Sequence, residues 1–205
     1  MLNRSWLTVV GLALLGFITT ATTTECVADS IKMNVGYLTA SDFLPAFVAK
    51  ELGFFQKRGI DATLTRIALA SNMPAALVSN SIDIGVSTGP NLLQAAEGRL
   101  DLVAIAGATR AIKDAPIISL LVRPGLTVAG AEDLKGRKIG VPGFNSLVDV
   151  MLRKWLRDRK LAPADFTLIE APLPQMPDLL KSGTLDAVAA IEPVRSRQPR
   201  RASRT

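Results

Sequence analysis

The chain has 205 residues, of which 48% are hydrophobic and 5% aromatic, and its formal net charge at pH 7 is +6. Five arginines in the last eleven residues supply most of that charge, since residues 29–194 carry 18 Lys/Arg against 17 Asp/Glu. A nearly neutral body with few aromatics argues against nucleic-acid binding. The chain has no histidine and one cysteine, Cys26. Histidine-based acid–base catalysis, histidine metal sites and a disulfide framework are therefore excluded. We expect no enzyme activity, no metal and no cofactor, although carboxylate or lysine catalysis stays open.

Residues 1–28 have the pattern of a signal peptide. Arg4 supplies a positive end, Trp6–Ile18 is an almost unbroken apolar run, and Cys26-Val-Ala28 is an acceptable cleavage site. Cleavage after Ala21 is a competing choice. An uncleaved membrane anchor is the alternative, because no residue from Ser5 to Thr24 is charged. We expect an exported, periplasmic protein.

Strands and helices alternate along residues 29–114, which we expect to form a first lobe. The predicted elements are strand Ile31–Leu38, helix Phe43–Phe55, strand Ile60–Ile67, helix Ser71–Asn80, strand Ile82–Val86, helix Asn91–Glu97 and strand Leu102–Ala106. Apolar residues recur at three- to four-residue spacing in the helix Phe43–Phe55, so we expect one face of it to pack on a sheet.

Residues 115–194 continue the alternation as a partial second lobe. The predicted elements are an extended run Pro116–Val122, a helical turn Ala131–Leu134, a strand from Lys138, helix Ser146–Lys160, strand Phe166–Ile169, helix Met176–Lys181 and strand Leu185–Ile191. Such alternation implies an α/β fold with two mostly parallel sheets flanked by helices. The arginine-rich residues 195–205 have almost no apolar content and are predicted to be a disordered basic tail.

The two halves are similar to each other. Val35 and Val141 are 106 residues apart, Ser41 and Ser146 are 105, Asp61 and Asp165 are 104, and Asp83 and Asp186 are 103. This drift of three residues suggests two lobes of one design. Chance similarity between two ordinary α/β units is the alternative.

Ligands of open parallel sheets bind beyond the carboxyl ends of the strands. That rule predicts a ligand-binding role for four groups of residues that follow strands. They are Thr39, Ala40, Ser41 and Asp42; Ser87, Thr88, Gly89 and Asn91; Asn145 and Ser146; and Glu192. Ser146 opens a helix and Asp149 stands three residues later, which is close to a capping box. The turn before that helix is expected to aim free N–H groups at a polar or anionic ligand atom. If the lobes face each other, all four groups line one cleft, although each group alone is an ordinary cap or turn.

The chain resembles the sulfonate/nitrate/taurine-type substrate-binding proteins of ABC importers over roughly residues 31–194. The similar segments include Val35-Gly-Tyr37, Lys50-Glu-Leu-Gly-Phe-Phe55, Gly59-Ile-Asp61, Ser81-Ile-Asp-Ile-Gly85, Asp133-Leu-Lys-Gly-Arg-Lys-Ile-Gly-Val141, Leu180-Lys-Ser-Gly-Thr-Leu-Asp-Ala187 and Glu192-Pro193. The resemblance implies a monomeric, two-lobed periplasmic binding protein of type II that closes on a small solute. It would present that solute to a permease and its ATPase in the inner membrane.

The resemblance also assigns roles to single residues. Thr39–Asp42 would form the first ligand loop, Ser87-Thr88-Gly89 the second, and Phe144-Asn145-Ser146 the contribution of the other lobe, with Phe144 stacking on the solute. Glu192 would lie near the cleft, and Arg110 would pair with an anionic group. Family members are usually longer and return to the first lobe after completing the second. We therefore expect a truncated or frame-shifted product in which the second lobe and that return are incomplete.

Three functions remain open. The leading hypothesis is a solute-binding component that carries a sulfonate, nitrate, taurine-like or related solute. The alternatives are an enzyme on the same scaffold, such as a lyase or a protein handling thiamine-pyrimidine precursors, and a ligand-sensing input domain. The absence of histidine and the single cysteine favour binding over catalysis.

Overall fold

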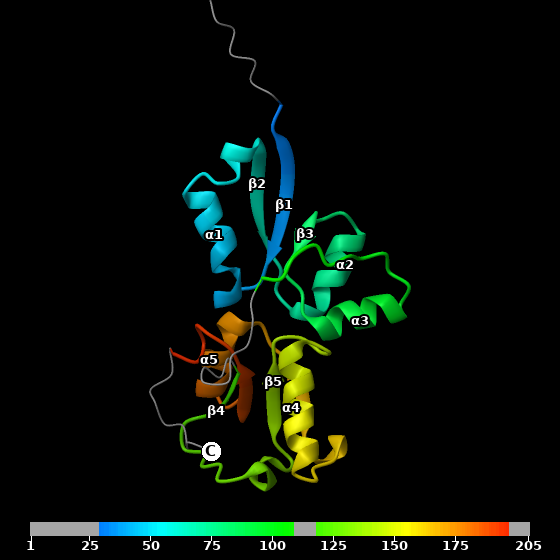
Figure 1. Ribbon diagram of the computed structural model, residues 1–205. Helices are drawn as coiled ribbons and strands as arrows, with labels where there is room; N and C mark the ends of the chain where they lie inside the picture. The colour runs from blue at the N-terminus through cyan, green and yellow to red at the C-terminus, as the bar shows by residue number, and fades with distance from the viewer. Residues whose placement is uncertain (1–28, 109–117, 197–205) are drawn as a thin grey trace, which may run out of the picture.

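A computed structural model describes residues 29–108 and 118–196, which we call lobe 1 and lobe 2. The predicted signal peptide, Arg110, the predicted boundary near residue 114 and nearly all of the arginine-rich tail lie outside the described residues. Figure 1 shows the two lobes stacked end to end, each built on its own sheet. The α/β class with mostly parallel sheets is confirmed.

Lobe 1 is a three-stranded parallel sheet flanked by short helices. Its elements are β1 (Ile31–Tyr37), α1 (Leu44–Glu51), β2 (Ile60–Arg66), α2 (Met73–Val78), β3 (Ile84–Gly85) and α3 (Gly89–Glu97). The strand order is β2-β1-β3, and Val35 of β1 lies opposite both Leu64 and Ile84. Strand β1 is therefore central, and its carboxyl end leads directly into the turn before α1.

The predicted strand Leu102–Ala106 was wrong. Residues 102–106 form no strand, and the side chains of Val103 and Ile105 are 78% and 73% exposed. Their alternating apolar pattern is typical of a half-buried strand. Strand β3, however, has only two residues, so it offers a very short edge to pair with.

Lobe 2 is a four-stranded mixed sheet with a larger core. Its elements are β4 (Ser119–Val122), β5 (Lys138–Val141), α4 (Leu147–Asp158), β6 (Thr167–Glu170), α5 (Met176–Lys181) and β7 (Ala187–Ala190). The order is β4-β7-β5-β6, with β4 antiparallel to β7 and the other pairs parallel. All four residues of β7 are buried, as expected of a central strand covered on both faces.

The internal repeat predicted from the sequence corresponds to equivalent structure in the two lobes. The order β2-β1-β3 in lobe 1 matches the order β6-β5-β7 in lobe 2. The Asp83 carboxylate accepts the N–H of Asn34 in β1 at 2.7 Å, and the Asp186 carboxylate accepts the N–H of Lys138 in β5 at 3.0 Å. Each aspartate therefore ties the chain entering the last parallel strand of its lobe to the central parallel strand, β3 to β1 in lobe 1 and β7 to β5 in lobe 2.

Candidate functional site

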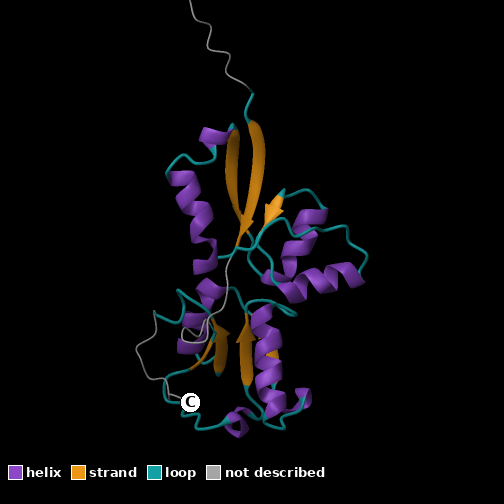
Figure 2. Cartoon of the chain, in the orientation of Figure 1, coloured by secondary structure: helices purple, strands orange, loops and turns teal. Residues whose placement is uncertain are grey.

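The two lobes meet through the turns that follow their parallel strands. The arrows of β1 and β5 point toward the boundary between the lobes (Figure 2). Across this boundary Ser41 N–H donates to the Glu192 carbonyl at 3.1 Å, and Ala70 N–H donates to the Pro142 carbonyl at 2.9 Å. Leu147 N–H donates to the Thr88 hydroxyl at 3.3 Å. The carboxyl ends of the strands therefore face one another, and the lobes are in direct contact.

A cavity of about 70 Å³ lies at this boundary and is lined by residues of both lobes. Four of the predicted site residues line it: Ala40, Asp42, Thr88 and Ser146. Much of the remaining lining is apolar and includes Leu38, Phe43, Val86, Ile118, Leu173 and Ile191. The lining is thus mostly apolar with a few polar groups.

Thr88 and Asn91 form a polar pair at the start of α3. The Thr88 hydroxyl donates to Asn91 Oδ1 at 2.7 Å while it accepts the N–H of Leu147. The Asn91 side chain is buried, with 2% of the residue exposed, and its Nδ2 has no partner among the described residues. A buried donor without a partner is costly, and this amide belongs to a residue beside the cavity-lining Thr88 rather than to the lining itself.

Ser71, the first residue of the predicted helix Ser71–Asn80, carries a second buried polar group. Its hydroxyl has no partner among the described residues, although Ala70 beside it lines the cavity. A serine in a turn before a helix has the ordinary signature of a cap. Burial of the hydroxyl at the lobe boundary depends on tertiary packing, so local sequence gives no signal for it.

The start of α4 is held by reciprocal hydrogen bonds. The Ser146 hydroxyl accepts the N–H of Asp149, and the fully buried Asp149 carboxylate accepts the N–H of Asn145 at 2.8 Å and Arg153 Nε at 2.7 Å. The predicted Ser146 cap is therefore confirmed, but the Asp149 carboxylate accepts the N–H of Asn145 and not that of Ser146, which a capping box would require.

The same turn does not present free N–H groups, contrary to the prediction. Phe144 N–H donates to Glu170 Oε1 at 2.6 Å, and Ser146 N–H donates to the Gly143 carbonyl at 3.3 Å. The N–H groups of Asn145 and Leu147 are bonded to Asp149 and Thr88. In this conformation the four N–H groups of the turn are all bonded within the protein. The turn therefore contributes Ser146 and apolar surface to the cavity.

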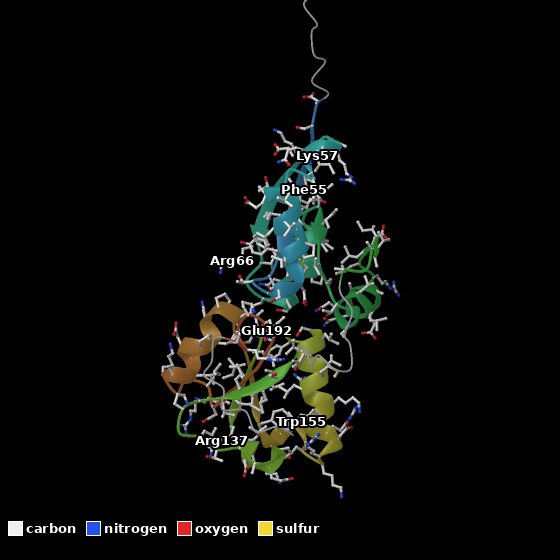
Figure 3. The ribbon with its side chains drawn as sticks, turned by 60° about the vertical axis from the view of Figure 1, so that its left-hand side comes forward. Phe55, Lys57, Arg66, Arg137, Trp155 and Glu192 are labelled. Atoms are coloured by element: carbon white, nitrogen blue, oxygen red, sulfur yellow. The ribbon has the colours of Figure 1, made fainter. Side chains whose placement is uncertain are left out.

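The other predicted site residues lie around the cavity without lining it. The Phe144 ring packs against the buried core of lobe 2 and does not line the cavity. The Glu192 carboxylate bonds to Arg195 Nε at 3.2 Å and to Ser196, so it turns toward the end of the described chain; Figure 3 shows Glu192 at the lobe boundary. Thr39 is half-buried, and Ser41, Ser87, Gly89 and Asn145 are exposed.

Two further observations concern residues 29–108 and 118–196 alone. Within these ranges no group of three or more His, Cys, Asp or Glu side chains could hold a metal ion. No helix in the same part of the chain has the length and apolar character needed to cross a membrane.

Comparison with known proteins identifies the family. Residues 28–202 match the NMT1-like family, and the chain belongs to it. A Haemophilus influenzae protein whose name assigns it to thiamine biosynthesis is 27% identical over 162 residues, which is 78% of this chain and 49% of that protein.

Solved structures show the same fold. The alkanesulfonate-binding protein SsuA of Xanthomonas axonopodis pv. citri, bound to MOPS, superposes with a TM-score of 0.67 at 21% identity, over 82% of this chain and 57% of that one. The periplasmic nitrate-binding protein NrtA of Synechocystis PCC 6803 gives a TM-score of 0.60 at 20% identity, over 80% and 48% of the two chains. The two-lobed periplasmic-binding-protein fold is confirmed. The chain spans about half the length of these proteins.

Proposed function

We propose that this protein is the extracytoplasmic solute-binding component of an ABC importer. It binds a small organic or anionic solute, such as a sulfonate, nitrate or a taurine-like molecule, between lobe 1 and lobe 2. The observation that carries this proposal is the cavity at the lobe boundary, to which the turns after β1, β3 and β5 all contribute. The partners are an inner-membrane permease and its ATPase, and the protein acts as a monomer in the periplasm.

The polar groups around the cavity favour a solute that carries both acceptors and donors. Asn91 Nδ2 and the hydroxyl of Ser71 are unpaired donors for sulfonate, nitrate or carboxylate oxygens. Asp42 lines the same cavity and repels a bare anion, whereas it pairs well with an ammonium or hydroxyl. A small zwitterion of the taurine type satisfies both.

Binding proceeds by movement of the lobes, with no bond made or broken in the solute. In the conformation described, the cavity of about 70 Å³ is far smaller than the several hundred Å³ typical of sites for larger ligands. The lobes must therefore part to admit a solute and then close on it.

Isothermal titration of the full chain with taurine, alkanesulfonates, nitrate, amines and aromatic acids tests the proposal. One of these solutes should bind, and Asn91→Ala should weaken it about tenfold because a hydrogen bond to a charged group is lost. Asn72→Ala is the matched control, since Asn72 is exposed, lies in the same lobe and makes no side-chain capping bond. Absence of heat with every solute would overturn the proposal.

An enzyme on the same scaffold is the second candidate, which the thiamine-biosynthesis name of the Haemophilus influenzae relative leaves open. Incubation of the protein with thiamine-pyrimidine precursors, followed by mass spectrometry of the products, distinguishes the two. Turnover of a precursor without binding of any transported solute would establish the enzyme instead.

A further inference from the structure

A second and larger cavity lies on the outer side of α4, outside the lobe boundary. Its volume is about 380 Å³, and Val150, Arg153, Lys154 and Arg157 of α4 form one wall. These positions are three or four residues apart, so they share one face of the helix. Ser146 at the boundary precedes Arg157 by eleven residues, which is about 16 Å along a helix. We call this cavity the α4 groove.

The floor of the α4 groove is apolar. The floor consists of three residues that follow α4 in the chain, Leu161, Pro163 and Phe166. Two of them, Leu161 and Phe166, also belong to the buried core of lobe 2. Val150 is 39% exposed and faces the groove from the first half of the helix. The alkyl stems of the arginine and lysine side chains add further apolar surface to the wall.

The rim of the groove is cationic, and one of its charges is unpaired. Arg153 Nε is bonded to Asp149 at 2.7 Å, and Lys154 Nζ to Asp158 at 2.7 Å. The Arg157 guanidinium makes no hydrogen bond or ion pair within the described chain, although its charge, after the stronger effect of Lys154, helps lower the pKa of the exposed Asp158 carboxyl. Three cations face two carboxylates, so the rim retains a net positive charge at neutral pH.

We propose that the α4 groove binds an amphiphilic monoanion, a short alkyl or aryl group that carries a carboxylate, sulfate, sulfonate or phosphate head. The head pairs with the guanidinium of Arg157 and with the outer nitrogens of Arg153. The apolar part lies on Val150, Leu161 and Phe166. Charge complementarity and the volume, which suits one small molecule, favour a free monomeric amphiphile over a flat lipid surface. The groove is independent of the cleft between the lobes.

Isothermal titration of the full chain with sodium octyl sulfate, kept below its micelle concentration, tests this site. Arg157→Gln should weaken binding about tenfold through loss of one charge-assisted contact. Lys181→Gln on α5 removes the same charge from an exposed position of lobe 2 and should leave the affinity unchanged. Val150→Glu, at a partly exposed position that tolerates a polar residue, should abolish binding by placing a carboxylate in the groove.

Sodium sulfate and 1-octanol separate the contributions of head and tail, and each alone should bind far more weakly than octyl sulfate. Affinity should also fall as sodium chloride rises, because the charges of the rim are exposed. Equal affinity of the Arg157→Gln and Lys181→Gln variants would overturn the proposal. Binding to phosphatidylglycerol vesicles without binding of monomeric octyl sulfate would overturn it in favour of a membrane surface. Loss of octyl sulfate binding in Asn91→Ala would place the amphiphile in the cleft and also overturn it.

Discussion

At the scale of single residues, Asp83 and Asp186 show how one carboxylate organises each lobe. Asp83 accepts the main-chain N–H of Asn34 in β1, and Asp186 accepts that of Lys138 in β5. Asp186 also contacts Arg123 at 3.0 Å and Arg137 at 3.7 Å, whereas Asp83 is exposed and has no ion pair within the described residues. The N–H of Lys138 above all, helped by these arginines, holds the pKa of Asp186 below its usual range.

Replacement of Asp186 should therefore cost more than replacement of Asp83. Asp186→Asn is expected to destabilise the protein by roughly 2 kcal/mol, the size of a lost charge-assisted hydrogen bond, and Asp83→Asn by less. Urea denaturation of both variants at pH 7 measures the difference. Equal losses would mean that the two arginines contribute nothing to the role of Asp186.

The same aspartate predicts a pH dependence. The pKa of Asp186 is lower in the folded chain than in the unfolded chain. In the unfolded chain that pKa is about 4. Its contribution to stability is thus complete above about pH 4 and is lost as the pH falls through the folded-state pKa. Denaturation curves measured between pH 7 and pH 2 should show that the free energy of unfolding decreases more in the wild-type protein than in the Asp186→Asn variant as the pH falls. Parallel losses in the two proteins would contradict the linkage.

The spacing of 103 residues identifies Asp83 and Asp186 as equivalent positions of the repeat. It does not indicate which groups their carboxylates accept hydrogen bonds from. The unpaired amide of Asn91 and hydroxyl of Ser71 are a different case. Their burial is created by contacts between residues far apart in the chain, and no local pattern encodes it.

At the scale of elements, the turn between β5 and α4 controls how closely the lobes approach. Gly143 lies in this turn, and a Cβ built on it would be 2.6 Å from the nitrogen of Ser71 and 2.9 Å from that of Ala70. Both distances are shorter than real Cβ contacts, and the atoms met belong to the backbone of lobe 1. Glycine is therefore needed here for space between the lobes.

Gly143→Ala should hold the lobes apart and weaken solute binding at least about tenfold, since strain of this kind costs roughly 1–3 kcal/mol. Gly130→Ala is the matched control, because a Cβ on Gly130 meets no atom within 4 Å. Titration calorimetry measures the affinity, and small-angle X-ray scattering should show a larger radius of gyration for Gly143→Ala. Unchanged affinity and radius would mean that the contact is not required for closure.

Sequence patterns located the well-formed elements accurately. Helix α4 lies within the predicted Ser146–Lys160 because its cap and apolar stripe are both local signals, and α5 coincides with the predicted Met176–Lys181. Helix α1 ends at Glu51, earlier than predicted, because Gly53 adopts a positive φ of 68° and turns the chain. The error at Leu102–Ala106 shows that an alternating pattern does not make a strand without an edge to pair with.

At the scale of the whole molecule, the two lobes differ in how much they bury. The core of lobe 2 comprises two clusters of buried side chains, whereas the cluster of lobe 1 contains Phe43, Met73 and Ile82. Helix α1 has no buried residue, and Leu44, Val48 and Leu52 lie on one face with 60%, 39% and 58% exposure. An apolar stripe of this kind favours nonspecific association.

The double substitution Leu44→Glu/Leu52→Glu should reduce self-association at high concentration, with a change in stability of about 0.5 kcal/mol or less, because both side chains are exposed. Sedimentation velocity over a concentration series measures this. The exposed Gln56→Glu, which adds negative charge without altering the stripe, should have little effect. Equal self-association of the two variants would exclude the α1 stripe as its cause.

The alternation of strands and helices, together with the repeat, was enough to predict two lobes, whereas the facing of their strand ends was a condition that only the structure could supply. It was not enough to predict which of the proposed site residues line the cavity. Phe144 and Glu192 follow strands that end at the boundary, yet neither side chain lines the cavity. Phe144 packs on the core of lobe 2, and Glu192 pairs with Arg195.

Because each aspartate bonds within its own lobe, neither the Asp83 nor the Asp186 bond has to break when the lobes separate. Opening breaks the three hydrogen bonds described across the boundary, worth together about 3 kcal/mol at typical net values. A ligand that binds only the closed form, with a comparable binding free energy, would raise the ratio of closed to open molecules by about two powers of ten. If the proposed function holds, the balance between open and closed forms is thus set by these few hydrogen bonds.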